Sequence, residues 1–401
     1  MVTTTQNVPA LDDDPFGTEI LTDPYEFHRR LRDAGPVVRL PRYDGLVAMG
    51  RYTEVKATLT DWERFVSGRG AGLSDFAREK PWRPPSPILE ADPPDHTAVR
   101  TVLNAVISPR AVRGMRARFA PFAEELADAL VARGRFDAVT DLAEVYPLRV
   151  FPDAFGLPAE GRQNLLRYGE LATNALGPRN QLLLDAFAAA AEAQEWVRAH
   201  CERDKLAPQS LGAEIWAAAD RGEITHEQAP LVVRSVLSAG FDPVVIGLGN
   251  AMYALARHPQ QWAALHADPK LTKFAFDEAL RWESPFQTFF RTTSVDTEVA
   301  GTTIPKDTKV LLFLGSANRD SRHWGQNAEE LDVHRAASGH VVFGTGIHQC
   351  VGQLVARLEA ELVLGALTRR AACLELDGEP VPKLNNMLRG WASIPVRVTA
   401  A

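Results

Sequence analysis

Short runs of β-branched and other apolar residues occur in two separate parts of the chain. Residues 37–40 and 46–49 form two such runs near the N-terminus, and residues 286–293 form a third after a Ser-Pro turn. Runs of this length and composition, bounded by turn residues, are typical of strands. They predict a small β-rich lobe built mainly from residues 37–66 and 286–312.

Helical patterns dominate the remainder of the chain. They occur over residues 23–32 and 52–59, and through an Ala-, Leu-, Glu- and Arg-rich stretch from 111 to about 223. That stretch is expected to break at Gly134, Pro152, Gly177-Pro178 and Pro208. Residues 230–256 predict one long apolar helix. The pattern therefore predicts a mainly α protein with a small β-rich lobe.

One long segment has neither pattern. Between residues 67 and 94 the chain is dense in Gly and Pro but also carries basic and aromatic side chains. Large side chains favour a long ordered loop over a flexible linker. Because ordered loops often carry binding residues, this loop is a candidate part of a functional site.

Composition and charge narrow the class of protein. The chain has 401 residues, of which 45% are hydrophobic, and a formal net charge of −7, which argues against nucleic acid as a partner. No apolar run reaches the roughly 20 residues of a membrane span. Residues 1–14 are polar and acidic, unlike a signal peptide. Together these features predict a cytoplasmic protein that does not bind membranes.

Cys350 has the most distinctive surroundings of the three cysteines. Cys201, Cys350 and Cys373 are far apart and form no CxxC pair, so neither a disulfide framework nor a zinc site is indicated. Cys350 lies within residues 343–352, Phe-Gly-Thr-Gly-Ile-His-Gln-Cys-Val-Gly, directly before a strong helical run. A helix N-terminus favours a thiolate, which is a good metal ligand. The alternative is a buried structural cysteine.

The spacing Phe-Gly-x-Gly-x-His-x-Cys-x-Gly closely resembles the haem-binding loop of cytochromes P450, and the resemblance extends over essentially the whole chain. It implies that residues 1–401 form a single domain with the P450 fold, that haem b is the cofactor, and that Cys350 is the thiolate ligand of the iron. The glycines suit a backbone that turns tightly beneath the porphyrin.

Four further residues match positions that hold the haem propionates in this family. His96 and Arg100 are four residues apart, so they project from one face of a predicted helix, in a segment similar to the family's Asp-Pro-Pro-x-His-x-x-x-Arg. Arg291 matches the third position and His348 the fourth. Cationic donors suit carboxylates. For His96 and Arg100 the alternative is a solvated helix face.

Glu278 and Arg281 form a Glu-x-x-Arg motif on a predicted helix. Alone, two opposite charges at this spacing form a weak surface pair. With the cysteine loop downstream, the motif resembles the buried ion pair that supports the P450 fold.

The run Ala239-Gly240-Phe241-Asp242 resembles the family's central helix, which crosses the distal face of the haem. There Gly240 would permit close approach to the iron. Where the family normally has threonine, this chain has Pro243, so the helix is expected to kink or widen. The hydroxyl that helps to deliver protons is lost, and we expect water and Asp242 to replace it.

Polar donors on this helix and in the long loop suit a carboxylate ligand. They are Arg234, Ser235, Ser238, Arg83 and Ser86. Both stretches resemble those of bacterial P450s that oxidise para-substituted benzoates such as 4-methoxybenzoate, which implies an aromatic carboxylic acid as substrate. The alternative is that Arg83 is a solvated loop charge and that Arg234 pairs with an acid.

Apolar residues are expected to hold the aromatic ring. Leu89, Phe286 and Phe289 are the candidates for the walls of the pocket. In the related enzymes, aromatic residues occupy the positions of Thr173 and Leu176. The pocket is therefore expected to be roomier and to admit an additional ring substituent, although plain core packing is an equally good explanation of the segment around Thr173.

The resemblance implies a monooxygenase that uses O₂ to remove the methyl group of a para-methoxybenzoic acid, giving a phenol and formaldehyde. With no reductase domain in 401 residues, electrons would come from a ferredoxin and its reductase, docking near Cys350 on a monomeric enzyme. Two alternatives stay open. One is a P450 that hydroxylates another carboxylate, such as a terpenoid or fatty acid. The other is a haem protein that binds ligands or senses gas without turnover, for which Pro243 is the best argument.

Overall fold

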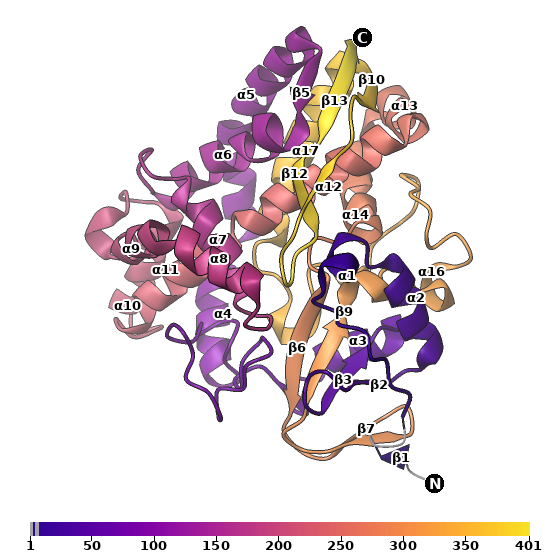
Figure 1. Ribbon diagram of the computed structural model, residues 1–401. Coiled ribbons are helices and arrows are strands. Elements are labelled where there is room, and N and C mark those ends of the chain that lie inside the picture. The colour runs from indigo at the N-terminus through magenta and orange to yellow at the C-terminus, as the bar shows by residue number, and fades with distance from the viewer. Residues whose placement is uncertain (1–2, 5–7) are drawn as a thin grey trace.

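The computed structural model describes residues 3, 4 and 8–401, so residues 1, 2 and 5–7 of the polar N-terminal segment lie outside it. The longer helices are α2 (Tyr25–Ala34), α3 (Tyr52–Thr60), α4 (Asp95–Val106), α5 (Pro109–Arg133), α6 (Val145–Phe155), α7 (Asn164–Asn174), α8 (Gln181–Ala189), α9 (Ala191–Ala199), α10 (Leu211–Asp220), α11 (Gln228–Ala239), α12 (Asp242–Arg257), α13 (Pro259–Ala267), α14 (Thr272–Trp282) and α17 (Gln353–Arg370). Short helices are α1 (Thr18–Thr22), α15 (Leu314–Ala317) and α16 (Ser321–Trp324). Helices make up the left and upper parts of Figure 1, with the largest sheet below them. The prediction of a mainly α protein with a small β component is confirmed.

Strands from two distant parts of the chain form a five-stranded sheet in the order β2-β3-β9-β6-β4. Its members are β2 (Val38–Leu40), β3 (Leu46–Met49), β4 (Phe65–Val66), β6 (Thr288–Thr293) and β9 (Lys309–Phe313). The smaller sheets contain β1 (Thr3–Thr4), β5 (Arg135–Asp137), β7 (Thr297–Val299), β8 (Thr302–Ile304), β10 (Ala371–Leu376), β11 (Val381–Lys383), β12 (Gly390–Ser393) and β13 (Pro395–Ala400). The hairpin strands β11 and β12 return along α12, which brings C-terminal residues to the central helix.

The register of β6 separates core residues from site residues. Side chains alternate between the two faces of a strand. Phe290 is fully buried in a cluster with Phe27 and Phe313. The guanidinium of Arg291 instead lies 5.9 Å from the ring centre of Phe289, so these two share the opposite face.

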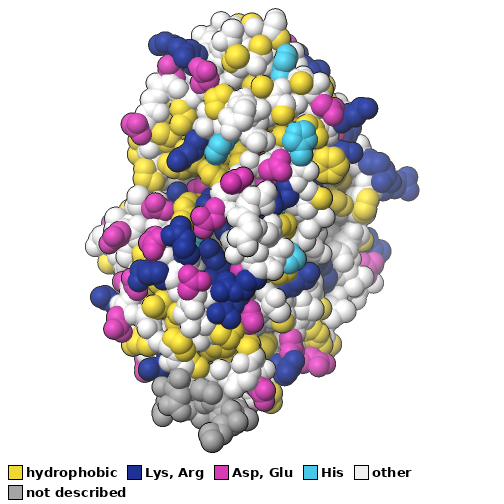
Figure 2. Space-filling view, turned by 90° about the vertical axis from the view of Figure 1, so that its right-hand side faces the viewer, with side chains coloured by type: hydrophobic (Ala, Val, Ile, Leu, Met, Phe, Trp, Pro, Cys, Tyr) yellow, Lys and Arg dark blue, Asp and Glu magenta, His cyan; other side chains and the backbone are white. Residues whose placement is uncertain are grey.

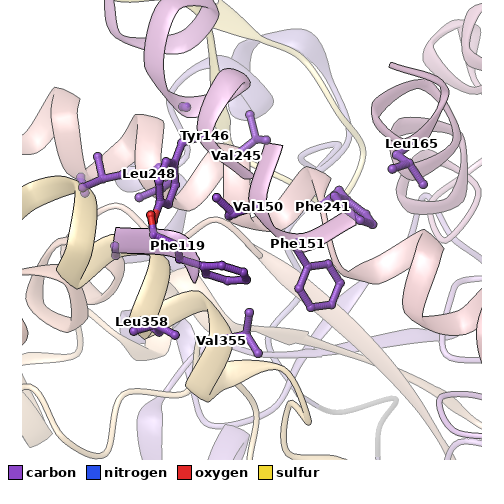
Figure 3. Packing of buried hydrophobic residues seen from close by; sticks show 14 of the residues in the cluster. Phe119, Tyr146, Val150, Phe151, Leu165, Phe241, Val245, Leu248, Val355 and Leu358 are labelled. Carbon is purple, nitrogen blue, oxygen red and sulfur yellow. The ribbon is translucent and has the colours of Figure 1, made fainter. Parts of the chain in front are cut away.

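The predicted helix over residues 230–256 is two helices. The helix α11 ends at Ala239, and α12 begins at Asp242 with Pro243 in its first turn. Proline has no N–H to give to the carbonyl of Ala239, and its ring clashes with that turn. The expectation of a disturbed helix at Pro243 is therefore correct, but the disturbance is a full break. Phe241 turns inward at the break, and its ring packs 5.3 Å from that of Phe151 (Figure 3).

One of the predicted helix breaks is wrong. Pro152 is predicted to interrupt the helical pattern, but it lies inside α6. The carbonyl of Leu148, which the missing N–H would have bonded, accepts a hydrogen bond of 3.4 Å from Arg162 instead. The helix can therefore continue past the proline.

The segment Gln228–Arg257 is long and apolar enough to cross a membrane by length and composition, but 56% of its most apolar window is buried within the protein. That burial identifies it as core. The molecular surface carries charges of both signs. Figure 2 shows basic side chains gathered near the middle of one face, with acidic ones among and around them.

Candidate active site

The loop that carries Cys350 is shaped by two glycines. Gly344 and Gly346 have φ values of 66° and 70°, in the left-handed region that disfavours other residues. A Cβ on Gly346 would also lie 3.0 Å from the carbonyl oxygen of Leu59. The loop then returns on itself, because the N–H of Cys350 donates to the carbonyl of Phe343 at 2.8 Å. These glycines therefore place Cys350 just before α17.

The Cys350 thiol is accessible yet lies deep enough for burial to raise its pKa. The N–H groups of Gly352 and Gln353 act in the opposite direction, as does the nearby positive charge of Arg100. The local donors therefore favour the thiolate, as expected at a helix N-terminus, but burial has the larger effect on the pKa. A bound cation would remove the proton outright.

Cys350 does not belong to a multidentate protein site. In the part of the chain that the structure describes, no group of three or more His, Cys, Asp or Glu side chains could hold a metal ion. A single thiolate fits a metal whose other ligands come from a prosthetic group, which is the arrangement that haem provides.

Four basic side chains meet close to this loop. His96 and Arg100 come from α4, Arg291 from β6, and His348 from a short 3₁₀ turn, Gly346–His348. The two imidazole rings are 4.5 Å apart, and among the described residues neither Nε2 atom has a hydrogen-bond partner, although both are buried. Arg291 is 3% exposed and donates to the carbonyl of Phe290 at 2.7 Å. The Arg100 guanidinium donates to the carbonyl of Gln349.

Burial and mutual repulsion make this cluster electrostatically unfavourable by itself. Burial, then the charges of Arg291 and His96, lowers the pKa of His348 to about 3. Burial lowers the pKa of Arg291 to about 10, and it also lowers the pKa values of His96 and Arg100. Buried donors without acceptors cost free energy unless a ligand supplies the acceptors. The cluster therefore fits the two carboxylates of a haem.

Gly240 has a packing role that the sequence did not reveal. A Cβ at this position would lie 2.7 Å from the carbonyl oxygen of Val236 and 3.3 Å from the ring of Phe151. The glycine is thus required by the turn between α11 and α12 and by the contact with α6.

Asp242 is the buried acid of this region. Asp242 is 1% exposed. A Cβ built on Gly169 of α7 would lie only 2.7 Å from the Cβ of Asp242, so α7 passes directly over the acid. Burial raises the pKa of Asp242 to about 6, partly offset by Lys383. The nearest cation is Lys383, whose Nζ lies 3.9 Å from Oδ1. A carboxyl group with this pKa can hold or release a proton near neutral pH.

The long loop 67–94 is fastened to α11 by hydroxyl and guanidinium contacts. The hydroxyl oxygens of Ser86 and Ser235 are 2.7 Å apart and buried. Nη2 of Arg234 donates to the carbonyl of Pro84 at 2.6 Å. The Ser238 hydroxyl donates to the carbonyl of Ser235 at 3.1 Å. These contacts bring the polar residues predicted from the loop and from the helix together.

Neither half of the simple alternative for the two arginines holds. Arg83 is not a solvated charge, because its side chain is 11% exposed and pairs with Glu90 at 3.0 Å. Arg234 forms no ion pair with any described residue. Burial and the charge of Arg83 lower its pKa. Arg234 is therefore the guanidinium of this region that lacks a carboxylate partner among the described residues.

The residues predicted to surround the aromatic ring of the substrate differ in the contacts that they make within the protein. Phe286 and Phe289 have ring centres 5.5 Å apart, and the N–H of Leu89 donates to the Ser86 hydroxyl at 3.2 Å. Thr173 differs, because its hydroxyl donates to the carbonyl of Gly169 at 2.9 Å and accepts from Asn385 at 3.0 Å. The Leu176 carbonyl accepts from the N–H of Leu73 at 2.8 Å, which joins α7 to the long loop.

Three residues that form ion pairs in this region are not predicted from the sequence: Glu90, Glu170 and Lys383. Glu90 follows Ser86 by four residues, and its carboxylate accepts a hydrogen bond from the Ser86 N–H at 2.7 Å. This Ser-to-Glu spacing is the local signal in the sequence for such a turn. Lys383 approaches Asp242 only because β11 folds back onto α12. Nothing local in the sequence marks that contact.

Comparisons with known proteins agree with this geometry. The sequence model of the family described as Cytochrome P450 matches residues 191–396. The chain is 53% identical to Cytochrome p450 CYP199A2 of Rhodopseudomonas palustris over 98% of this chain and 95% of that protein. The structure resembles that of cytochrome P450 CYP109Q5 from Chondromyces apiculatus with a TM-score of 0.83 and 30% identity, over 97% of this chain and 99% of that one. It also resembles cytochrome P450 CREJ in complex with (4-ethylphenyl) dihydrogen phosphate, with a TM-score of 0.85 and 26% identity, over 96% of this chain and 99% of that one.

Proposed function

The chain belongs to the cytochrome P450 family, and from that premise we propose that it removes the methyl group of a para-methoxy-substituted benzoic acid. The coarser activity, a haem-dependent monooxygenase that uses O₂ and external electrons, follows from the family. The finer assignment rests on one observation, the buried Ser86 and Ser235 hydroxyl pair beside Arg234. The expected products are the para-hydroxybenzoic acid and formaldehyde.

Haem b would be held by residues that already converge. Cys350 would bind the iron, and the cluster of His96, Arg100, Arg291 and His348 would bind the propionates. When bound, the haem supplies the activation of O₂ and the oxidation of the substrate's methyl group. The chain itself must bind the substrate in one orientation and supply protons.

Orientation begins at the carboxylate end of the substrate. The Ser86 hydroxyl can turn to donate to a carboxylate oxygen, and the Ser235 hydroxyl can do so by giving up its bond of 2.8 Å to the carbonyl of Leu231. The Arg234 guanidinium adds a positive charge. The structural relative CREJ was solved with a para-substituted ring that has an anionic end, which supports a ligand of this class. With the anion fixed there, Phe286, Phe289 and Leu89 would hold the ring, and the para substituent would face the haem.

We predict that Arg234→Ala weakens 4-methoxybenzoate binding about ten- to hundred-fold, since a charge-assisted hydrogen bond contributes on the order of 1.5–3 kcal/mol. The measurement is the haem spectral shift during titration with the acid. The methyl ester, which lacks the charge, is the control ligand and should lose little affinity.

A second role of Arg234 can be separated in the same experiment. Its guanidinium also anchors the loop through the carbonyl of Pro84. If that anchoring were its whole contribution, the acid and the ester would lose affinity equally, and the proposed contact with the carboxylate would be wrong.

Protons for oxygen activation are assigned to Asp242 and water, in place of the usual threonine hydroxyl. We predict that Asp242→Asn slows demethylation strongly, because the amide cannot replace the acid. Burial raises the pKa of Asp242 to about 6, above its value in the unfolded chain. The protonated side chain therefore contributes stability at low pH, and this contribution is lost as the pH rises through about 6. The same variant should therefore unfold at a higher temperature than the native protein at pH 8. A loss of activity accompanied by a loss of stability would instead indicate a damaged fold.

One observation favours a second candidate function. Pro243 removes the hydroxyl on which the family relies, which suits a haem protein that binds ligands without turnover. Product analysis with a ferredoxin, its reductase and 4-methoxybenzoate distinguishes the two. Formaldehyde with the matching phenol supports the demethylase, and reductant consumption that yields only peroxide supports the alternative.

The remaining assignments complete the proposal. The enzyme would act in the cytoplasm as a monomer, with electrons from a ferredoxin docking on the side of Cys350. Thr173 and Leu176 carry smaller side chains than the aromatic residues at these positions in the related enzymes, so ring-substituted acids such as 3,4-dimethoxybenzoate should also bind.

A further inference from the structure

The carboxyl group of Asp242 contacts a charged cluster on the side of α12 that faces the C-terminal hairpin. The Nζ atom of Lys383, in β11, lies 3.9 Å from Oδ1 of Asp242 and 3.0 Å from the carboxylate of Glu170 in α7. Glu144, just before α6, is the third charged group that acts on Asp242. Three separate elements thus bring their charges to one buried carboxyl group.

A small cavity adjoins this cluster. Its volume is about 20 Å³, and its lining includes Asp242, Lys383, Glu144 and Trp391. A cavity of this size holds about one water molecule, provided that polar groups surround it.

Two of the lining groups lack a partner among the described residues. The Nε1 donor of Trp391 and the Oδ2 acceptor of Asp242 are both buried without a hydrogen bond. Buried polar atoms are rarely left unsatisfied, and one bridging water can satisfy a donor and an acceptor on two residues that line the same cavity.

The cluster also reaches the surface. The side chain of Lys383 is 29% exposed and that of Glu170 is 36% exposed, whereas the side chain of Asp242 is buried. The buried acid is therefore linked to partly exposed side chains through Lys383 and Glu170. No residue of the long loop or of α11 lines the cavity.

We propose that a water molecule held by Trp391 in this cavity connects Asp242 to solvent, and that Lys383 is the positioning residue that sets the charge of Asp242. This inference rests on the proposed role of Asp242 in oxygen activation. A proton that leaves Asp242 toward the haem side is replaced from solvent through this water, so the net charge of the cluster is restored after each transfer. Lys383 keeps its proton throughout.

The arrangement gives opposite expectations for two neighbouring substitutions. Lys383 stabilises the carboxylate form of Asp242, so Lys383→Met should raise the pKa of Asp242. Glu170 and Glu144 act in the other direction, so Glu170→Gln should lower it. A merely structural role of the cluster would not produce shifts of opposite sign.

The test is an infrared pH titration of the protonated carboxyl band in haem-loaded, substrate-free protein, with Asp242→Asn used to identify the band. The expected midpoint is near pH 6 in the native protein, higher in Lys383→Met and lower in Glu170→Gln. Lys306→Met, which changes an exposed lysine elsewhere, is the matched control and should leave the midpoint in place. Midpoints that move together, or not at all, would overturn the role of Lys383.

The water is tested separately with Trp391→Phe, which removes the Nε1 donor and changes no charge. During turnover of 4-methoxybenzoate this variant should release more peroxide per reductant consumed and should show a larger solvent isotope effect than the native enzyme. Coupling and isotope effect equal to those of the native enzyme would rule the water out. Because the infrared titration requires no turnover, a failure to demethylate would count against the proposed substrate and not against Lys383.

Discussion

Replacing Cys350 with alanine is expected to abolish the absorption band of the reduced, CO-treated protein from which the P450 family takes its name. That band requires a thiolate ligand on the haem iron, and Cys350 is the cysteine that the glycine-shaped loop places before α17. Alanine has no atom that can bind iron. The measurement is the reduced CO difference spectrum of protein purified with added haem.

Cys373→Ala is the matched control, because Cys373 is also a free, exposed cysteine but lies in β10. It should retain the band in full. The assignment of Cys350 would be wrong if its alanine variant kept the band at the native position, or if Cys373→Ala lost it. The four basic residues that would hold the propionates are unchanged in Cys350→Ala. The haem content of this variant should therefore fall by a smaller fraction than its CO absorption band.

The parts of the site that could be predicted from the sequence are those in which the chemistry lies within one short segment. The loop with Cys350 and His348 is contiguous, so its spacing alone defines the turn. His96 and Arg100 are one helical turn apart, and α4 does present them together. Such local geometry follows from backbone periods that the sequence records directly.

The parts that could not be predicted depend on contacts between distant segments. Pro152 stays inside α6 because Arg162 reaches the carbonyl that the proline leaves unbonded. The charge of Arg83 is neutralised by Glu90, and Asp242 meets Lys383 from the far end of the chain. A period of 3.6 residues predicts which face a side chain takes, but it carries no information about which other segment packs there.

The fold itself depends on the ion pair within α14, and breaking it is the second large effect that we expect. Glu278 and Arg281 are both 0% exposed, and two hydrogen bonds of 2.7 and 2.8 Å join the guanidinium to the carboxylate. The guanidinium also donates to the carbonyls of Asn318, Ala328 and Glu330 at 2.9, 2.7 and 2.8 Å. It thus ties residues 318–330, which follow α15, to α14.

Removal of one partner of such a pair typically costs about 3–5 kcal/mol, because the other charge stays buried. The two partners should nevertheless differ. In Arg281→Met, three carbonyls and a carboxylate lose their donor, although Arg335 still contacts Glu278 at 3.2 Å. In Glu278→Gln, Arg281 keeps its three carbonyl acceptors. Arg281→Met is therefore expected to be the more destabilising substitution.

Denaturant unfolding of the haem-loaded protein measures both free energies of unfolding, and the haem retained after purification reports on the folded fraction. The matched control is Arg198→Met. Arg198 pairs with Glu195 at the same three-residue spacing, but these side chains are 74% and 67% exposed. Exposed pairs contribute little because water and salt screen them, so this control should unfold like the native protein. Arg281→Met could instead be as stable as the control, or less destabilising than Glu278→Gln. The contacts of Arg281 with the three carbonyls would then not hold residues 318–330 to α14, and the loss of stability would come from the carboxylate alone.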